Sequence, residues 1–189
     1  VHENVIPNKD IENLTKEEIV NIVKEAGIVG MGGATFPTHV KISPPQGKNI
    51  DTVILNGAEC EPYLTADHRL MLENPEDVVY GLYILMKALD VKKGYIGIEV
   101  NKLDAIEAIE KEVKKYGEDT KVAIRNVRRD MVDSLKKIEK EENLPEDAVK
   151  DNQDKIQKLT DKYVGIIDSL VVKKEKEVKR IGFRSLKNG

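Results

Sequence analysis

The sequence predicts an α/β segment with a small parallel sheet, followed by a long all-α helical hairpin. Two short apolar runs, each followed by a segment with helical spacing, predict the sheet. Beyond residue 118 the apolar residues step by three and four, and only Pro145 and Gly165 interrupt the stretch 119–180. The 34% of charged and 4% of aromatic residues also suit solvated helices better than a β-sandwich.

The first helix is expected at residues 15–26. Thr15 and Glu18 have the spacing of a capping box, in which each side chain accepts a hydrogen bond from the other residue's amide. Apolar residues follow at helical spacing, and Gly27 provides the stop. A glycine-rich loop is then expected from Gly30 to Lys41.

Two buried parallel strands are expected at residues 52–55 and 95–98. Both segments are short continuous apolar runs, as in strands that are covered on both faces. A helix between them begins at Asn74, with Pro75 in its first turn, and carries Tyr83 and Met86 as expected core residues.

The remaining helices alternate apolar and charged residues. A helix is expected from Leu103 to Tyr116, and one continuous helix from Leu103 past Lys140 also fits the pattern. The segment 142–147 separates two seams that most often pack as an antiparallel hairpin. The apolar seam residues are Ile124, Val127, Met131, Leu135 and Ile138, then Ile156, Leu159, Tyr163, Ile166 and Leu170.

Charge and cysteine content exclude several classes of protein. The 189 residues carry 31 basic and 34 acidic side chains, a net charge of −3, which argues against a general nucleic-acid binder. Cys60 is the only cysteine, so no disulfide framework or cysteine-ligated iron–sulfur cluster is expected from this chain alone. We predict no metal site and no catalytic residue, since the three histidines are scattered. Without a signal-peptide pattern or a long apolar run, we expect a cytoplasmic protein.

Two loops carry the chemistry of the first part. The run from Gly27 to Pro37 can bring several amides close to an anion, but the pattern taken alone favours a tight loop without a ligand. Lys41 could neutralise a phosphate there. The segment from Asn56 to Pro62 follows the first strand, at the edge where ligands bind in open α/β sheets, although exposed acids in a turn remain the alternative.

These two segments resemble the C subunit of the Rnf electron-transport complex. The similarity covers residues 1–117, rests on Gly27–Lys41 and on NGAECEPYLTADHRLML at Asn56–Leu72, and extends more distantly to the flavoprotein subunit of respiratory complex I. It implies a partial Rossmann-like domain that holds FMN and accepts hydride from NADH. The residues that it implies for the flavin phosphate and ring are Gly30, Gly32, Gly33 and Lys41. Those that it implies for the flavin and nicotinamide side are Asn56, Glu59, Glu61 and Glu99.

The resemblance also implies partners and a setting. If the part is active, it is an NADH-dependent flavin oxidoreductase that transfers electrons within an Rnf-type complex, with other Rnf subunits at the inner membrane face. We expect a truncated flavin segment, because the family's iron–sulfur region does not follow in this sequence. The chain is then cytoplasmic or peripheral to the inner face of the cell membrane.

The helical part carries a basic cluster and a second resemblance. Arg125, Arg128 and Arg129 lie within five residues, as phosphate binding requires, although a solvated charged face is the alternative. Residues 118–181 are similar to the last two helices of ribosome recycling factor. The similarity implies that the three arginines contact ribosomal RNA and that a translocase GTPase is a further partner. The tail 182–189 matches neither family.

The two resemblances lead to two hypotheses. The leading one is an FMN- and NADH-binding electron-transfer segment, and the alternative is a ribosome-binding module. Because natural proteins rarely join these functions, the pattern indicates a chimera, a rearranged reading frame or an assembled sequence. We also expect self-association, since two helices of a three-helix bundle leave an apolar seam uncovered.

Overall fold

The computed structural model describes residues 11–31, 34–45, 47–59, 61–142 and 145–185, and of residues 140, 142 and 174–185 it describes the backbone alone. The chain divides into two compact units, Val1–Ile109 and Glu110–Gly189. Helices dominate both units, and the described strands form one two-stranded parallel sheet in the first unit. Among the described residues, no helix combines the length and the apolarity needed to cross a membrane.

The first unit begins with a 3₁₀ turn, η1 (Ile11–Asn13), and helix α1 (Lys16–Glu25). The capping box is confirmed, because the Thr15 hydroxyl accepts from the Glu18 amide at 3.3 Å and the Glu18 carboxylate accepts from the Thr15 amide at 2.8 Å. Gly27 follows the helix with φ of 66°, a conformation that favours glycine, so its role as the stop is confirmed as well.

The expected glycine-rich loop ends in a one-turn helix, α2 (Thr38–Lys41), which the sequence pattern did not predict. Pro37 holds its φ at −59° directly before this turn. Ile42, directly after it, is buried with Ile19 and Val23 of α1. This burial fixes the end of the loop against α1.

The sheet pairs β1 (Val53–Asn56) with β2 (Gly94–Gly97). The strands are parallel, as predicted, with Val53 opposite Gly94 and Asn56 opposite Gly97. They are not buried on both faces as expected, because Ile54 is 71% and its partner Tyr95 41% exposed. Each strand is displaced by one residue from its expected position, β1 towards the C-terminus and β2 towards the N-terminus. The register between the strands sets these ends, and the apolarity of one strand alone does not reveal it.

Two helices connect the strands where the sequence predicted one. Helix α3 (Ala66–Glu73) precedes α4 (Pro75–Leu89), and Pro75 occupies the first turn of α4 as predicted. Met86 packs against the core of Val53, Leu82 and Val91, as expected. Tyr83 is 38% exposed instead, because its hydroxyl donates to the Glu12 carboxylate at 2.5 Å.

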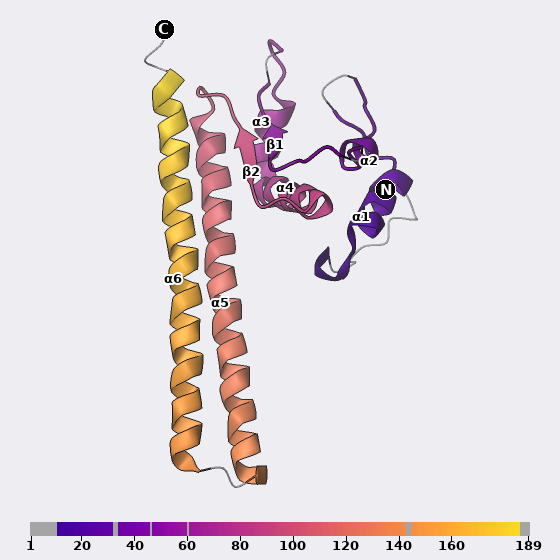
Figure 1. The fold of residues 1–189 in the computed structure, drawn as a ribbon. Coiled ribbons are helices and arrows are strands. Elements are labelled where there is room, and N and C mark those ends of the chain that lie inside the picture. The colour runs from indigo at the N-terminus through magenta and orange to yellow at the C-terminus, as the bar shows by residue number, and fades with distance from the viewer. Residues whose placement is uncertain (1–10, 32–33, 46, 60, 143–144, 186–189) are drawn as a thin grey trace. The chain divides into compact units, whose positions relative to one another are not determined.

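Helix α5 (Leu103–Glu142) is continuous, and α6 (Glu146–Ser185) follows it. Figure 1 shows the two helices side by side as an antiparallel hairpin. The Lys121 ammonium group donates to Asp168 at 2.8 Å, and Arg128 donates to Gln157 at 3.4 Å. These contacts confirm the expected hairpin, and the uninterrupted helix Leu103–Glu142 confirms the continuous form of its first helix. The expected seams are wrong in detail, because seven of their ten residues are exposed: Val127, Met131, Ile138, Leu159, Tyr163, Ile166 and Leu170.

Candidate functional site

The loop after β1 is held against the end of β2. The Gly57 amide donates to the Gly97 carbonyl at 2.8 Å, and Asn56 accepts the Ala58 amide with its side-chain oxygen at 3.1 Å. A Cβ atom at Gly57 would stand 3.0 Å from the Gly97 carbonyl oxygen and 3.2 Å from the Met71 sulfur. A side chain at this position would therefore press against the Gly97 carbonyl group, so glycine suits the close approach.

Glu59 caps helix α3 from outside the helix. Its carboxylate accepts the amides of Asp67 at 3.1 Å and His68 at 3.5 Å, in the first turn of the helix. These amides have no partner within the helix, and the positive end of the helix dipole favours an anion. The Glu59 side chain is only 5% exposed. The loop is thereby tied to α3 by one buried carboxylate.

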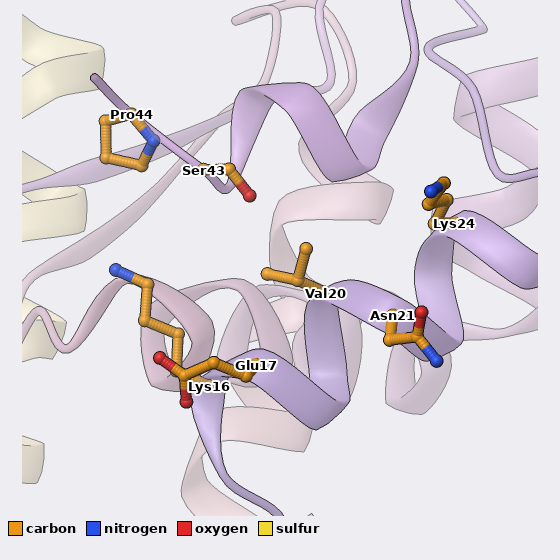
Figure 2. A pocket seen from close by; sticks show the side chains of 7 residues that line it. All are labelled: Lys16, Glu17, Val20, Asn21, Lys24, Ser43 and Pro44. Carbon is orange, nitrogen blue, oxygen red and sulfur yellow. The ribbon is translucent and has the colours of Figure 1, made fainter. Parts of the chain in front are cut away.

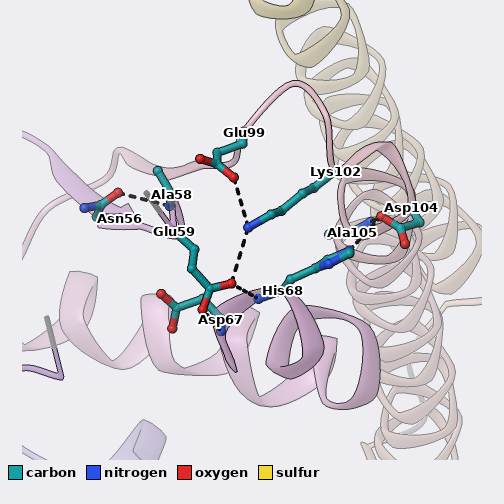
Figure 3. Close-up of polar contacts among 9 residues, drawn as sticks. All are labelled: Asn56, Ala58, Glu59, Asp67, His68, Glu99, Lys102, Asp104 and Ala105. Carbon is teal, nitrogen blue, oxygen red and sulfur yellow. Dashed lines mark hydrogen bonds and ion pairs between the residues drawn. The ribbon is translucent and has the colours of Figure 1, made fainter. Parts of the chain in front are cut away.

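Lys102 joins this carboxylate to the segment after β2. Its ammonium group lies 3.3 Å from Glu59 and 2.9 Å from Glu99, and its side chain is 12% exposed. Figure 3 shows Lys102 between the two acids, with Glu59 also directed at the start of α3. Two acids that the family resemblance assigns to the cofactor side therefore converge on one cation.

The pKa values of this group are shifted towards the charged forms. Burial raises the pKa of Glu59, but the amides of Asp67 and His68 and the ammonium group of Lys102 outweigh it, so the net pKa is lowered. The hydrogen bond to Glu99 raises the pKa of Lys102, burial lowers it, and the bond to Glu59 raises it further. Both groups are thus charged at neutral pH.

A histidine and an aspartate form a second pair beside this group. The His68 Nε2 atom lies 2.9 Å from the Asp104 carboxylate, which also accepts the Ala105 amide at 2.8 Å. The bond to His68, followed by the bond to the Ala105 amide, lowers the pKa of Asp104. The pair connects α3 to the first turn of α5, and no pattern in the sequence pointed to it.

The glycine loop is closed by backbone hydrogen bonds. The Gly30 amide donates to the Phe36 carbonyl at 2.8 Å, and the Thr38 amide donates to the Ile28 carbonyl at 3.0 Å. Lys41 extends back over this loop, so that a Cβ atom at Gly30 would stand 2.6 Å from its Nζ atom. The same Nζ atom lies 6.0 Å from the centre of the Phe36 ring. A cation is thereby placed next to Gly30 and the Phe36 ring.

The remaining predicted residues lie apart from these contacts. Gly32 and Gly33 lie outside the described residues. Glu61 is exposed, and its carbonyl accepts the Leu64 amide at 3.3 Å. We call Glu59, Glu99 and Lys102 the acid–lysine group. Among the described residues, we find no hydrogen bond or ion pair that joins the glycine loop to it.

The three arginines of α5 do not lie on one surface of the helix. Arg128 is half-buried and donates to Gln157 of α6 at 3.4 Å. Arg125 and Arg129 are exposed, and Arg129 donates to Asn126 at 2.8 Å. Because Arg125 and Arg129 are four residues apart, they lie on one face of the helix.

The two groups of predicted residues differ in how well they suit a flavin phosphate. Lys41 fits an anionic group, since its ammonium group stands where a side chain at Gly30 would otherwise lie. Glu59 and Glu99 differ, because their carboxylates already bind Lys102. The glycine loop therefore suits the phosphate, whereas the acid–lysine group holds the loop after β1 in place.

A surface pocket lies elsewhere in the first unit. Figure 2 shows it between α1 and the segment after α2, with a volume of about 430 Å³. Its lining residues are Lys16, Glu17, Val20, Asn21, Lys24, Ser43 and Pro44. None of the predicted cofactor residues belongs to it, so we assign it no role in cofactor binding. Within the described ranges, no three His, Cys, Asp or Glu side chains form a group that could hold a metal ion.

Comparison with known proteins identifies the family. Residues 23–165 match the family described as the Nuo51 FMN-binding domain, a match that continues past residue 118 into the segment compared above with ribosome recycling factor. The chain is 55% identical over 122 residues to the C subunit of the proton-translocating ferredoxin:NAD(+) oxidoreductase complex of Clostridium ljungdahlii, which is 65% of this chain and 26% of that protein.

Two further relatives give the same result. The identity is 53% over 118 residues with the C subunit of the Na(+)-translocating ferredoxin:NAD(+) oxidoreductase complex of Acetobacterium woodii, covering 62% of this chain and 26% of the relative. It is 46% over 119 residues with the C subunit of the ion-translocating oxidoreductase complex of Rhodobacter capsulatus, covering 63% and 23%. The chain thus spans about a quarter of the length of these curated relatives. The predicted resemblance of its N-terminal part to the C subunit of the Rnf complex is confirmed, and the chain belongs to the Nuo51 FMN-binding domain family.

Proposed function

We propose that the first unit binds FMN at the glycine loop and serves electron transfer from NADH in an Rnf-type, membrane-associated oxidoreductase. The family match over residues 23–165 carries this proposal. The position of the Lys41 ammonium group next to Gly30 supports it, because an anion at the loop would meet a positive charge there.

The proposal gives each predicted residue a role. Gly30, Gly32, Gly33 and Lys41 bind the phosphate and border the ring of FMN, which when bound supplies the reversible acceptance of hydride and release of electrons. The residues proposed for the flavin and nicotinamide side are Asn56, Glu59, Glu61 and Glu99. Glu59 and Glu99 act there through Lys102, which fixes the loop after β1 in one position.

The proposed partners are other subunits of an Rnf complex at the inner face of the membrane. The names of the relatives describe C subunits of complexes that act on ferredoxin and NAD(+) or translocate ions. By this proposal the bound flavin passes electrons to redox centres outside these 189 residues.

A flavin titration tests the proposal. FMN fluorescence should be quenched on binding to the chain, and Lys41→Ala and Gly32→Asp should both abolish the quenching. Gly30→Ala should weaken binding while keeping the charge, because the new Cβ atom must displace the Lys41 Nζ atom from 2.6 Å. Lys48→Ala is the matched control, since Lys48 is an exposed lysine of the same segment. Equal quenching by all variants, or none by the wild type, contradicts FMN binding at this loop.

The role of NADH needs a separate measurement. NADH added under anaerobic conditions to the FMN-loaded chain should bleach the flavin absorbance, and NADPH serves as the comparison. If FMN binds but NADH leaves the absorbance unchanged, the nicotinamide part of the proposal fails and the flavin part stands.

The second candidate function is ribosome binding through the hairpin, with a translocase GTPase as a further partner. The exposure of Arg125 and Arg129 on one face favours it, since two guanidinium groups there can reach neighbouring phosphates. Cosedimentation with ribosomes should then fall with salt, and the double change Arg125→Gln with Arg129→Gln should abolish it. Lys137→Gln, on another face of α5, is the control. Sedimentation that is independent of these arginines contradicts this role.

A further inference from the structure

We propose that the helical hairpin pairs with the hairpin of a second copy of the chain, through one apolar face, as an antiparallel four-helix bundle. The first observation is that α5 and α6 already bury one seam against each other. Lys121 binds Asp168 across it, and a Cβ atom at Gly117 would stand 2.8 Å from Val171. This seam accounts for one side of each helix.

A second apolar row on each helix remains uncovered within the described hairpin. Its eight residues are between 37% and 57% exposed. Along α6 they step by four, three and four residues, which is the spacing of a coiled-coil seam. The rows are Val113, Val127, Met131 and Ile138 on α5, and Leu159, Tyr163, Ile166 and Leu170 on α6.

The two rows lie on the same face of the hairpin. On α5, Val127 and Met131 lie one residue before and three after Arg128, which contacts α6. On α6, Leu159 and Tyr163 likewise lie one residue before and three after Thr160, which is buried. Because each residue turns the helix by about 100°, the residue one before and the residue three after a seam residue lie on the same side of it. Because the helices are antiparallel, equal turns bring both rows to one side.

The form of this face favours a second hairpin as the occupant. The face consists of two parallel rows on two helices, and a second copy offers the same two rows at the same separation. Isologous pairing through a two-fold axis is also the commonest arrangement in soluble oligomers. Packing four helices in this way covers both rows at once, as in four-helix bundles.

The charges beside the rows select the orientation. Next to the apolar row, the outer edge of α5 carries the exposed acids Asp119 and Asp130 with one exposed base, Lys137. The outer edge of α6 carries the exposed bases Lys155, Lys162 and Lys173 with one exposed acid, Asp151, which pairs with Lys155 at 2.6 Å. A two-fold axis parallel to the helices places α5 of one copy against α6 of the other, with acids opposite bases. The other face-to-face arrangement places α5 against α5, with acids opposite acids.

This orientation predicts particular pairs across the interface. A rotation about an axis parallel to the helices leaves each residue at the same height along that axis. The residues of α5 are therefore level with the same residues of α6 in the second copy as in their own hairpin, where Arg128 reaches Gln157 and Lys121 reaches Asp168. By these contacts Asp130 is level with residues 155–159 of the other copy, so that Lys155 and Lys162 both lie within about two helical turns of it.

Sedimentation velocity of the 189-residue chain over a range of concentrations tests the proposal. The wild type should form a dimer, and Val127→Glu should weaken the dimer by at least about tenfold, because it places a charge in the centre of the face. Val122→Glu is the matched control, since Val122 is 50% exposed against 57% for Val127 but lies on the opposite side of α5. Circular dichroism verifies that both variants keep their helices.

The orientation is tested by a charge exchange. Asp130→Lys or Lys162→Asp alone should weaken the dimer, and the two together should restore it. A chain that stays monomeric at high concentration overturns the proposal and leaves the face to a helix of a different protein. If Val127→Glu dimerises as strongly as Val122→Glu, the proposed face is not the interface. If the double charge variant dimerises as weakly as the single variants, the proposed orientation is wrong.

Discussion

Lys102 donates from its ammonium group to the Glu59 carboxylate at 3.3 Å, across 43 residues of chain. The same carboxylate accepts two amides at the start of α3, so one buried acid connects the loop after β1, helix α3 and the segment after β2. The loop that follows Asn56 is therefore positioned by an ion pair as well as by the sheet.

Replacing this acid should destabilise the first unit. Glu59→Gln keeps the size of the side chain but removes the charge that faces Lys102 and the amides of α3, and it leaves the lysine beside Glu99 alone. We expect a lower midpoint of thermal unfolding by circular dichroism. Glu61→Gln is the matched control, because Glu61 is exposed in the same loop. Equal midpoints for the two variants contradict a structural role for Glu59.

The same pair predicts how stability depends on pH. The pKa of Glu59 is lowered from its ordinary value of 4.5, so its contribution is complete above that value and is lost as the pH falls through the folded-state pKa. The pKa of Lys102 is raised from 10.5, so its contribution is complete below that value and is lost as the pH rises through the folded-state pKa. Stability should therefore be level at neutral pH and fall on both sides.

Urea unfolding across the pH range measures these two limbs. The acid limb should become shallower in Glu59→Gln, and the alkaline limb should become shallower in Lys102→Met. An acid limb that is as steep in Glu59→Gln as in the wild type means that other carboxylates, such as Asp104 with its own lowered pKa, carry the effect.

Local patterns predicted much of the fold. Thr15 and Glu18 predicted the start of α1 because the capping box is formed by residues three apart in sequence. Pro75 predicted the start of α4 for a similar reason, since its fixed φ and missing amide suit the first turn of a helix. The two apolar runs correctly predicted a pair of parallel strands. Their burial on both faces was wrong, because Ile54 and its partner Tyr95 are 71% and 41% exposed.

Contacts between distant residues explain what the sequence did not predict. Lys102 had no distinguishing pattern, because its partner Glu59 is remote in sequence and only the pairing of β1 with β2 brings them together. Tyr83 has core spacing on α4 but is drawn outwards by Glu12. The roles of Gly30 and Lys41 in binding a flavin remain predictions, although their proximity agrees with a shared function.

Close packing beneath the sheet should make Gly94 intolerant of a side chain. A Cβ atom there would stand 2.5 Å from the Met86 sulfur and 3.1 Å from a Leu82 methyl group. We expect Gly94→Ala to lower the free energy of unfolding by about 1–3 kcal/mol through overpacking. Gly81→Ala, in the interior of α4 with nothing within 4 Å, should instead raise it by about 0.5–1 kcal/mol. Urea denaturation compares the two, and a stabilised Gly94→Ala variant would contradict the packing of this core.

The close approach of α5 and α6 at Gly117 should appear as coupling with Val171. Alanine at Gly117 gains helix propensity but places its Cβ atom 2.8 Å from a Val171 methyl group, so it should stabilise less than Gly165→Ala, which meets nothing within 4 Å. Val171→Ala removes the obstructing methyl groups. In a double-mutant cycle followed by urea unfolding, Val171→Ala should therefore cost less in the Gly117→Ala background than in the wild type, by about 0.5 kcal/mol or more. Additive effects would show that the two helices do not meet at these residues, and the register of the hairpin would then have to differ from the one in which Lys121 binds Asp168.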